Sequence, residues 1–336
     1  MINFTDIRSV HLEISTRCNA ACPECPRNFH GVDIIENYPL TDMTLEQAKK
    51  IFTEPFLKQL NHILINGNYG DFITARDGLA IVEYFRSTNP TLQIEISTNA
   101  SGRPNWWTRL GELGIRVHFR LDGLEDTHHL YRQYTDFNLI IDNAKKYIAA
   151  GGFAIWAMIP FKHNRHQIDQ CRQLSKELGF KHFYLNDMGR DTGVVFTRDK
   201  KFSHVLGDYP INENNTNFDG LWEHYKSYVN FPEITINAEH PNREISCKAK
   251  ASKQIYIAAN GEVYPCCWLG FYPLDVSGIM GNPGNHQTKL LIKNHNALEH
   301  GLEETIKWFN LVEESWKLES VKAGKIYTCN ETCGIK

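Results

Sequence analysis

The sequence predicts an α/β protein with a parallel sheet over its first 190 residues, followed by a smaller α+β unit. Short apolar runs alternate in the first part with stretches of helical spacing, which is the pattern of repeated βα units. About six such units fit before residue 190, too few for a closed eight-fold barrel. Nine cysteines gather mainly in two sets near the two ends of the chain, which predicts two metal sites.

The predicted strands are short apolar runs bounded by glycine or polar residues, at residues 10–14, 62–66, 92–97, 116–121, 153–159 and 182–186. Helical spacing predicts a helix that begins at Thr44 and others over residues 76–87, 105–113, 137–150 and 165–178. Gln47 follows Thr44 by three positions, as in a capping box, and supports that start. In such sheets ligands bind beyond the carboxyl ends of the strands, so the loops there form the candidate site.

The pattern changes beyond residue 190. Residues 191–233 are polar and weakly periodic, so we expect them to bridge two domains, 1–190 and 234–336. In the second domain Asn260-Gly261 separates two apolar runs, which predicts a hairpin with a type I′ turn. Helical spacing between residues 290 and 316 predicts one or two helices.

The overall composition excludes several classes of protein. Lysine and arginine number 36 against 39 acidic residues, so a net charge of −3 gives no electrostatic case for nucleic acid or a membrane surface. No run of about 18 apolar residues could span a bilayer. Residues 1–8 lack the pattern of a signal peptide. We therefore expect a cytoplasmic protein that binds neither nucleic acid nor membrane.

Three cysteines, Cys18, Cys22 and Cys25, follow the first predicted strand with the spacing C-x3-C-x2-C. Three thiolates in so short a loop can hold three irons of a [4Fe–4S] cluster and leave the fourth iron open to a substrate or cofactor. A structural zinc site and three unrelated thiols are the alternatives. Zinc sites usually show two paired ligand sets, and no second set lies nearby in the sequence.

This cysteine spacing after a short strand resembles the motif of the radical S-adenosylmethionine (SAM) enzymes. The resemblance implies a partial, six-fold (β/α)6 TIM-like barrel. It also implies that SAM chelates the open iron and that one electron from the cluster cleaves SAM to a 5′-deoxyadenosyl radical, which abstracts a hydrogen atom from substrate. A protein such as flavodoxin or ferredoxin is the expected electron donor.

Several loops at strand ends resemble the SAM contacts of that family. The loop 66–71 ends in Gly-Asp, similar to the family's Gly-Gly-Glu, which binds the SAM amino group. Residues 97–99, Ser-Thr-Asn, are similar to its Thr-Asn-Gly, which contacts the ribose. Ile159 ends the fifth strand, where adenine contacts are expected. The resemblance implies SAM contacts at Gly70, Asp71, Ser97, Thr98, Asn99, Arg120, Asp122, Arg132 and Ile159.

Two arginines compete for one of these roles. Residues 119–123, Phe-Arg-Leu-Asp-Gly, are similar to a family segment, Ser-x-Asp-Gly, whose downstream arginine pairs with the SAM carboxylate. Arg132 stands downstream, whereas Arg120 replaces the common serine. A guanidinium binds a carboxylate bidentately, so Arg120 is an alternative partner. Asp187 and Arg190 follow the sixth strand and are candidate substrate contacts.

The second set of cysteines resembles the auxiliary-cluster domains called SPASM and twitch. Cys247, Gly261 and Cys266 fit the pattern C-x13-G-x4-C, and Cys329 and Cys333 follow with C-x3-C. The resemblance implies that these four cysteines bind one auxiliary [4Fe–4S] cluster in a small α+β twitch-like domain, which gives the protein two clusters. A tetrathiolate zinc site is the alternative for the same ligands.

Cys267 is left over from this ligand set. Adjacent residues on an extended strand point to opposite sides, so Cys267 is expected to turn away from the cluster, toward a cavity between the domains. A thiol there could donate a hydrogen atom to a substrate radical, because its S–H bond is weaker than the C–H bonds being broken. The alternative is a small buried residue beside Trp268.

The expected function is that of a radical SAM enzyme that modifies a peptide or an amino-acid residue. A small-molecule enzyme, such as a sugar-alcohol dehydrogenase or an enzyme of cofactor or natural-product biosynthesis, is the main alternative. A non-catalytic iron–sulfur protein is a remote one, which the SAM-like loops disfavour.

Overall fold

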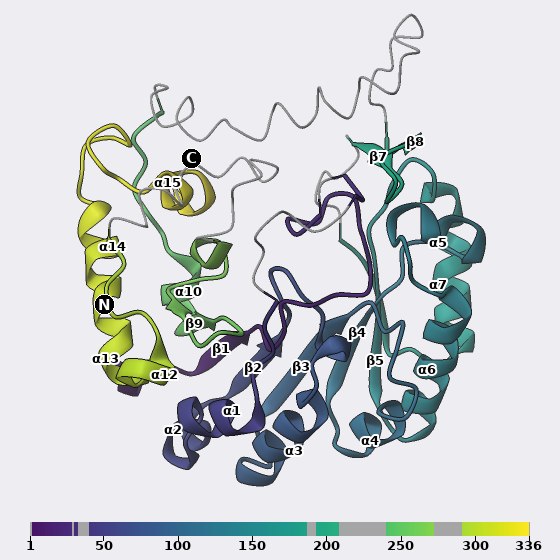
Figure 1. The fold of residues 1–336 in the computed structure, drawn as a ribbon, viewed down its shortest axis with the longest axis horizontal. Coiled ribbons are helices and arrows are strands. Elements are labelled where there is room, and N and C mark those ends of the chain that lie inside the picture. Colours follow the sequence, from purple (N-terminus) through teal and green to yellow (C-terminus); the bar gives the residue numbers. More distant parts are fainter. Residues whose placement is uncertain are drawn as a thin grey trace, which may run out of the picture.

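One curved eight-stranded sheet organises the part of the chain that the computed structural model describes, residues 2–28, 30–32, 40–186, 193–207, 240–271 and 291–335. Its order is β10-β9-β1-β2-β3-β4-β5-β6, and all neighbours are parallel except β9 and β10 (Figure 1). The strands are β1 Ser9–Leu12, β2 His62–Ile65, β3 Gln93–Thr98, β4 Arg116–Arg120, β5 Phe153–Met158, β6 His182–Leu185, β9 Gln254–Ile257 and β10 Val263–Tyr264. The six predicted strands of the partial barrel are confirmed.

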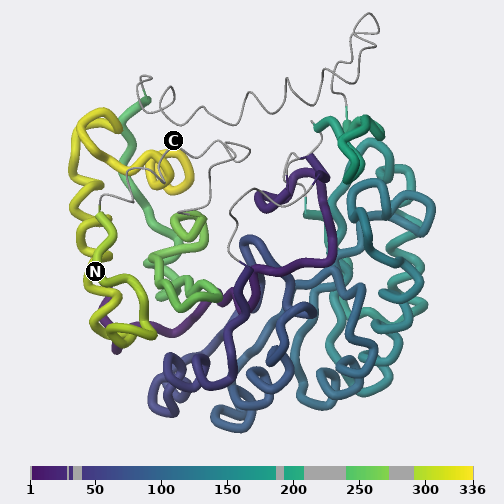
Figure 2. Tube along the Cα trace, viewed as in Figure 1, coloured from purple at the N-terminus to yellow at the C-terminus, as the bar shows by residue number. Residues whose placement is uncertain are grey.

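Helices cover the outer side of the curved sheet (Figures 1 and 2). They are α1 Leu45–Ile51, α2 Glu54–Gln59, α3 Gly78–Thr88, α4 Trp107–Glu112, α5 Glu125–Tyr131, α6 Phe137–Ala149 and α7 Ile168–Glu177. The predicted capping box is present at α1, where Thr44 and Gln47 bond each other's backbone N–H groups. The short helices α2 and α5 are additions to the predicted set.

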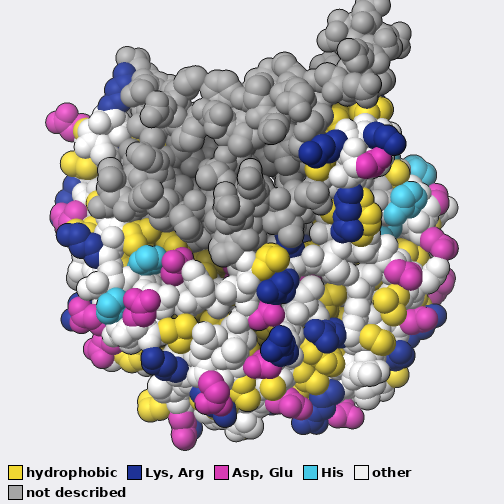
Figure 3. All heavy atoms as spheres, viewed as in Figure 1, with side chains coloured by type: hydrophobic (Ala, Val, Ile, Leu, Met, Phe, Trp, Pro, Cys, Tyr) yellow, Lys and Arg dark blue, Asp and Glu magenta, His cyan; other side chains and the backbone are white. Residues whose placement is uncertain are grey.

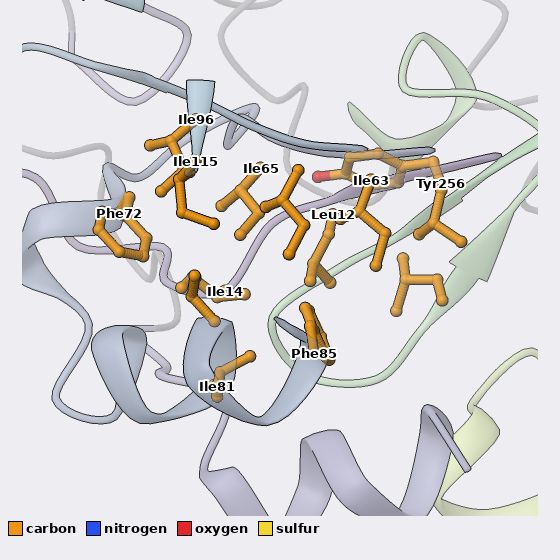
Figure 4. Packing of buried hydrophobic residues seen from close by; sticks show 14 of the residues in the cluster. Leu12, Ile14, Ile63, Ile65, Phe72, Ile81, Phe85, Ile96, Ile115 and Tyr256 are labelled. Carbon is orange, nitrogen blue, oxygen red and sulfur yellow. The ribbon is translucent and has the colours of Figure 1, made fainter. Parts of the chain in front are cut away.

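The core lies between the sheet and these helices. Ile63 and Ile65 of β2 are 0% and 1% exposed and pack with buried side chains of α3 such as Phe85 (Figure 4). Intervening strand positions carry polar side chains, including Glu95 of β3 and His118 of β4. The alternation means that one face of the sheet packs on helices and the other lines the inside of the barrel.

The strands β9 and β10 form the predicted hairpin, but the predicted type I′ turn is wrong. That turn needs two residues with positive φ. Of Asn260 and Gly261, Gly261 alone has a positive φ, of +86°, and its N–H bonds the carbonyl of Ala258. A Cβ on Gly261 would lie 2.7 Å from the side chain of Leu298, so packing as well as φ demands glycine there.

The β9 strand pairs in parallel with β1, so residues far apart in the sequence share one sheet (Figure 2).

Both expected domain boundaries, at residues 190/191 and 233/234, lie outside the described residues. Within the expected bridging segment, Val194–Phe196 (β7) and Phe202–Val205 (β8) form a separate antiparallel hairpin that the sequence did not predict.

Short helices surround the β9–β10 hairpin in sequence within the described C-terminal residues, 240–271 and 291–335. They are α10 Lys248–Ala251, α12 Ala297–His300, α13 Leu302–Thr305, α14 Phe309–Ser315 and α15 Tyr327–Cys333. The one or two helices expected between residues 290 and 316 are shorter pieces, because Gly301, with φ +77°, separates α12 from α13.

Among the described helices, none has the length and apolar character needed to cross a membrane. Basic and acidic side chains intermingle on the face shown in Figure 3.

Candidate functional site

A cavity of about 300 Å³ lies beyond the carboxyl ends of the barrel strands. It brings together the first cysteine set and, except for Asp122, every residue expected to contact SAM. Its lining includes Cys18, Cys22, Cys25, Gly70, Asp71, Ser97, Thr98, Asn99, Arg120, Arg132, Ile159 and Cys267. Strand order places them here, because parallel strands present all their following loops at one edge of the sheet.

The three-cysteine loop forms one wall of this cavity. Cys22 is buried, and its carbonyl accepts the backbone N–H of Cys25 at 3.0 Å. Burial, with the charge of Asp71 next, raises the pKa of Cys18 far above its usual range. A metal that binds the Cys18 thiol must therefore displace its proton. In the described parts of the chain, no three His, Cys, Asp or Glu side chains converge closely enough to bind a single metal ion. A cubane is a different case, because its thiolates bind different irons.

Glu13 organises the loop after β2, and the sequence pattern did not single it out. Its carboxylate is 1% exposed and accepts the backbone N–H groups of Tyr69 (2.8 Å) and Gly70 (3.0 Å). The hydroxyl of Tyr256 donates to the other oxygen at 2.9 Å. Burial raises the pKa of Glu13, and these hydrogen bonds oppose the rise. Gly70 lies so close to the segment after β1 that a Cβ would stand 1.8 Å from the carbonyl oxygen of Ser15.

Asp71 joins the loop after β2 to the loop after β3. One carboxylate oxygen accepts the hydroxyl of Thr98 at 2.5 Å and the other accepts the backbone N–H of Asn99 at 2.8 Å. The side chain is buried, which raises its pKa against the effect of these bonds. The carboxylate of Asp71 therefore holds the loop after β2 against the loop after β3 in the cavity wall.

Asn99 reaches the cysteine loop. Its Nδ2 donates to Cys18 Sγ at 3.7 Å and to Asn19 Oδ1 at 3.0 Å. Its Oδ1 accepts the backbone N–H of Ser101 at 2.9 Å. These contacts leave the side chain one orientation, against the cysteine loop.

Asp122 lies behind the cavity and positions two of its residues. It is 0% exposed, and its two oxygens accept Arg132 Nε and the backbone N–H of Ile159, each at 2.6 Å. Arg132 in turn donates Nη1 to Cys22 Sγ at 3.7 Å. Burial lowers the pKa of Arg132, but the charges of Asp122, Cys22 and Tyr131 together with the hydrogen bond to Asp122 outweigh burial, so the pKa of Arg132 is raised. The arginine is a fixed cation beside the cysteine loop.

Arg120 presents a second cation to the same cavity. It ends β4, and its Nε donates to Ser97 Oγ at 2.7 Å. Ser97 and Arg120 come from neighbouring strands, β3 and β4, whose pairing brings them together. The two arginines thus reach the cavity from different elements, Arg120 from a strand and Arg132 from the end of α5.

The four cysteines of the second set line one small pocket in the C-terminal part. Cys247 precedes α10, Cys266 follows β10, and Cys329 and Cys333 lie one turn apart on α15. The rest of the lining is Thr328, Thr332 and the apolar side chains of Ile245, Pro265, Trp268, Leu269, Val312 and Trp316. A hydrogen bond from Cys247 lowers the pKa of Cys333 below its usual range. The pocket thus gathers four thiols from three segments, a donor set that fits an auxiliary cluster.

Cys267 faces the large cavity, whereas its neighbour Cys266 lines the pocket of the second set. Trp268 lines both and separates them. Asn68 Nδ2 donates to the carbonyl of Cys267 at 2.8 Å, which fixes this segment against the loop after β2. Burial raises the pKa of Cys267 to about 11, so its thiol is protonated at neutral pH. Asp187 and Arg190 lie outside the described residues.

Known structures resemble this chain over most of its length. SuiB of Streptococcus suis bound to S-adenosylmethionine aligns with a TM-score of 0.52 and 14% identity, over 88% of this chain and 62% of SuiB. SuiB bound to its precursor peptide SuiA gives 0.54 and 14%, over 97% and 77%. The protein anSMEcpe with bound AdoMet gives 0.54 and 15%, over 95% and 85%. No family model and no curated protein matches the sequence. The chain has the fold of these SAM-bound proteins, as expected from its resemblance to radical SAM enzymes with a SPASM-type domain.

Proposed function

We propose that the protein is a radical SAM enzyme. Cys18, Cys22 and Cys25 would hold a [4Fe–4S] cluster, and the adjoining cavity would hold SAM. When bound, these groups supply a 5′-deoxyadenosyl radical that abstracts a hydrogen atom from substrate. The observation that carries the proposal is that three cysteines and the SAM-like loops, which come from separate segments, line one cavity at the strand ends.

Within this site we propose that Arg120 binds the SAM carboxylate. Arg132 already pairs with Asp122 and contacts Cys22. The guanidinium of Arg120 lines the cavity beside Ser97 and suits a bidentate carboxylate. Gly70 would let the SAM amino group approach the backbone, and Ile159 would contact the adenine.

A second [4Fe–4S] cluster is proposed at Cys247, Cys266, Cys329 and Cys333. The support is that the four thiols line one pocket with apolar walls. Four thiolates also suit zinc, and metal analysis separates the two cases.

The proposed substrate is a peptide or an amino-acid residue. SuiB has been crystallised with the precursor peptide SuiA, and anSMEcpe with the peptides Cp18Cys and Kp18Cys. A small-molecule substrate is the alternative. Asp187 and Arg190 remain candidate substrate contacts, and flavodoxin or ferredoxin the candidate electron donor.

We further propose Cys267 as a hydrogen-atom donor to the substrate radical. Its S–H bond would break while a C–H bond forms at the radical carbon. The resulting thiyl radical would need one electron, from the same class of reductant that serves the enzyme, and one proton from water. Support comes from the place of Cys267 in the same cavity as the first cysteine set.

Anaerobic reconstitution tests the function. The protein should take up about eight irons, four for each cluster. After reduction it should release 5′-deoxyadenosine from SAM, and Cys22→Ala should abolish this. Four irons with one zinc would overturn the auxiliary cluster alone. Continued SAM cleavage by Cys22→Ala would mean that the cluster has been assigned to the wrong residues.

A further inference from the structure

Two side chains from different loops donate N–H groups toward sulfurs of the first cysteine set. Asn99 Nδ2 lies 3.7 Å from Cys18 Sγ, and Arg132 Nη1 lies 3.7 Å from Cys22 Sγ. Asn99 follows β3 and Arg132 follows α5, so two separate segments converge on the cysteine loop.

We infer that Asn99 and Arg132 set the reduction potential of the cluster at Cys18, Cys22 and Cys25 through N–H···S hydrogen bonds to two of its thiolates. The inference rests on the proposed function, since it requires a cluster there. It differs from the sequence-based expectation, in which both residues contact SAM.

The physical argument concerns charge on the sulfurs. A reduced cluster carries one more negative charge than an oxidised one, and part of it resides on the thiolates. Hydrogen-bond donors and nearby cations stabilise that charge more in the reduced state, which raises the reduction potential. Arg132 supplies a full positive charge with its donor, whereas Asn99 supplies a dipole.

Both donors are held in place by other bonds. Asn99 is 2% exposed, and its remaining amide groups bond Asn19 and Ser101. Arg132 is fixed by Asp122 Oδ2, and its guanidinium lies 5.2 Å from the ring centroid of Tyr131. These bonds keep both donors directed at the sulfurs of the cysteine loop.

Neither contact is at an exposed surface. The side chain of Arg132 is 14% exposed and that of Asp122 is 0% exposed. Solvent screening is weak at such sites, so a charge there acts more strongly than one on the surface. Asp122 compensates the arginine in part, and we expect the net effect of the pair to be smaller than that of an isolated cation.

The test is a potentiometric titration of the reconstituted protein, followed by electron paramagnetic resonance in the absence of SAM. Asn99→Ala and Arg132→Met should each shift the midpoint potential of this cluster to a more negative value, with iron content unchanged. Arg132→Met should shift it further, because it removes a charge as well as a donor. Arg120→Met is the matched control. It also removes a cation from this cavity, but Arg120 Nε donates to Ser97 Oγ, so the shift in midpoint potential should be smaller.

Conservative variants cover the case in which a variant loses its cluster. Asn99→Asp keeps the shape but replaces the donor by an acceptor, so the potential should fall at least as far as in Asn99→Ala. Arg132→Lys keeps the charge and should retain most of the potential. Unchanged potentials with full iron content would overturn the inference and leave the two residues a structural role. Failure of the unmodified protein to bind iron at these cysteines would instead defeat the proposed function.

Discussion

The backbone N–H of Gly70 donates to the carboxylate of Glu13 at 3.0 Å, which ties the loop after β2 to the end of β1. Glu13 also accepts the N–H of Tyr69 and the hydroxyl of Tyr256, a residue of β9. One buried carboxylate therefore joins the segment that leads into the cysteine loop, a cavity loop and the C-terminal hairpin. The arrangement explains how distant segments can share a site, since Glu13 and Tyr256 differ by 243 positions.

Glu13→Ala should destabilise the protein and weaken SAM binding. The change leaves two buried N–H groups without their acceptor, at a cost of about 3 kcal/mol. Tyr256→Phe, which removes one donor and keeps the carboxylate, should cost about 1 kcal/mol. Urea unfolding measures both effects, and calorimetry measures SAM affinity. Equal stabilities for the two variants would show that Glu13 does not hold the loop.

Gly70→Ala should displace the loop after β2 and remove SAM binding. A Cβ at residue 70 would stand 1.8 Å from the Ser15 carbonyl oxygen, which is backbone and cannot rotate away. Gly114→Ala is the control, because that glycine has φ +64° but a Cβ there would meet no atom within 4 Å beyond its chain neighbours. It should cost only the strain of a left-handed residue, about 1 kcal/mol, and leave SAM affinity unchanged. Normal SAM affinity in Gly70→Ala would contradict the assignment of this loop to the site.

Arg120→Ala should weaken SAM binding more than Arg132→Ala does. A charge-assisted bidentate bond contributes about 1.5–3 kcal/mol, so loss of Arg120 should raise the dissociation constant about ten- to a hundred-fold. Arg132 is occupied by Asp122 and Cys22, and its removal should act mainly on the cysteine loop. Calorimetry on reconstituted protein gives both affinities. A larger loss of SAM affinity in Arg132→Ala than in Arg120→Ala would indicate that Arg132 binds the SAM carboxylate, as the family pattern implies.

Acid should destabilise the barrel through Glu95. A hydrogen bond from His118 lowers the pKa of Glu95 to about 2, against the effect of burial. The ordinary pKa of this group is 4.5. The depressed value means that the carboxylate stabilises the fold above about pH 4.5, and that this contribution is lost as the pH falls toward about 2. Glu95→Gln should therefore flatten the fall in unfolding free energy between about pH 4.5 and about pH 2.

Urea unfolding at several pH values measures this slope. Glu46→Gln is the control, because the Glu46 side chain is 83% exposed on α1. It should leave the slope as in the unmodified protein. A slope for Glu95→Gln equal to that of the control would show that the Glu95–His118 bond contributes nothing to the acid response.

The sequence predicted the sheet well because each strand is an apolar run with its own local signal, as in Ile63 and Ile65. Conformation that depends on distant packing was not predictable in the same way. The turn at Gly261 packs against Leu298. The hydrogen bonds of Glu13 depend on β9 and on the loop after β2, which are distant from it in the sequence. A lone carboxylate after a strand carries no local signal of such partners.

The candidate site shows the same division. The cysteine spacing and the strand-end loops predicted which residues would share a cavity, because topology alone brings those loops together. The orientation of individual side chains could not be predicted. Asp71 and Asn99 line the cavity, and their polar groups also bond neighbouring loops, which no sequence pattern indicated. Such bonds depend on small differences in distance that no sequence pattern encodes.

The adjacent thiols Cys266 and Cys267 should respond differently to the same substitution. Cys266 lines the pocket with Cys247, Cys329 and Cys333, whereas Cys267 lines the large cavity with the first cysteine set. Cys266→Ser should therefore lose about four irons, while Cys267→Ser keeps about eight and still cleaves SAM. Each variant is the control for the other, because the two cysteines are adjacent in the chain and both are replaced by serine.

If Cys267 donates the hydrogen atom, Cys267→Ser should abolish or divert the final product although both clusters and SAM cleavage persist. A serine O–H bond is much stronger than a thiol S–H bond, so the variant would fill the same space without quenching a carbon radical. Iron analysis and quantification of 5′-deoxyadenosine against product give the three readings. Full product formation would rule out the donor role. Loss of about four irons from Cys267→Ser, with Cys266→Ser unaffected, would exchange the roles of the two thiols and place Cys267 on the auxiliary cluster.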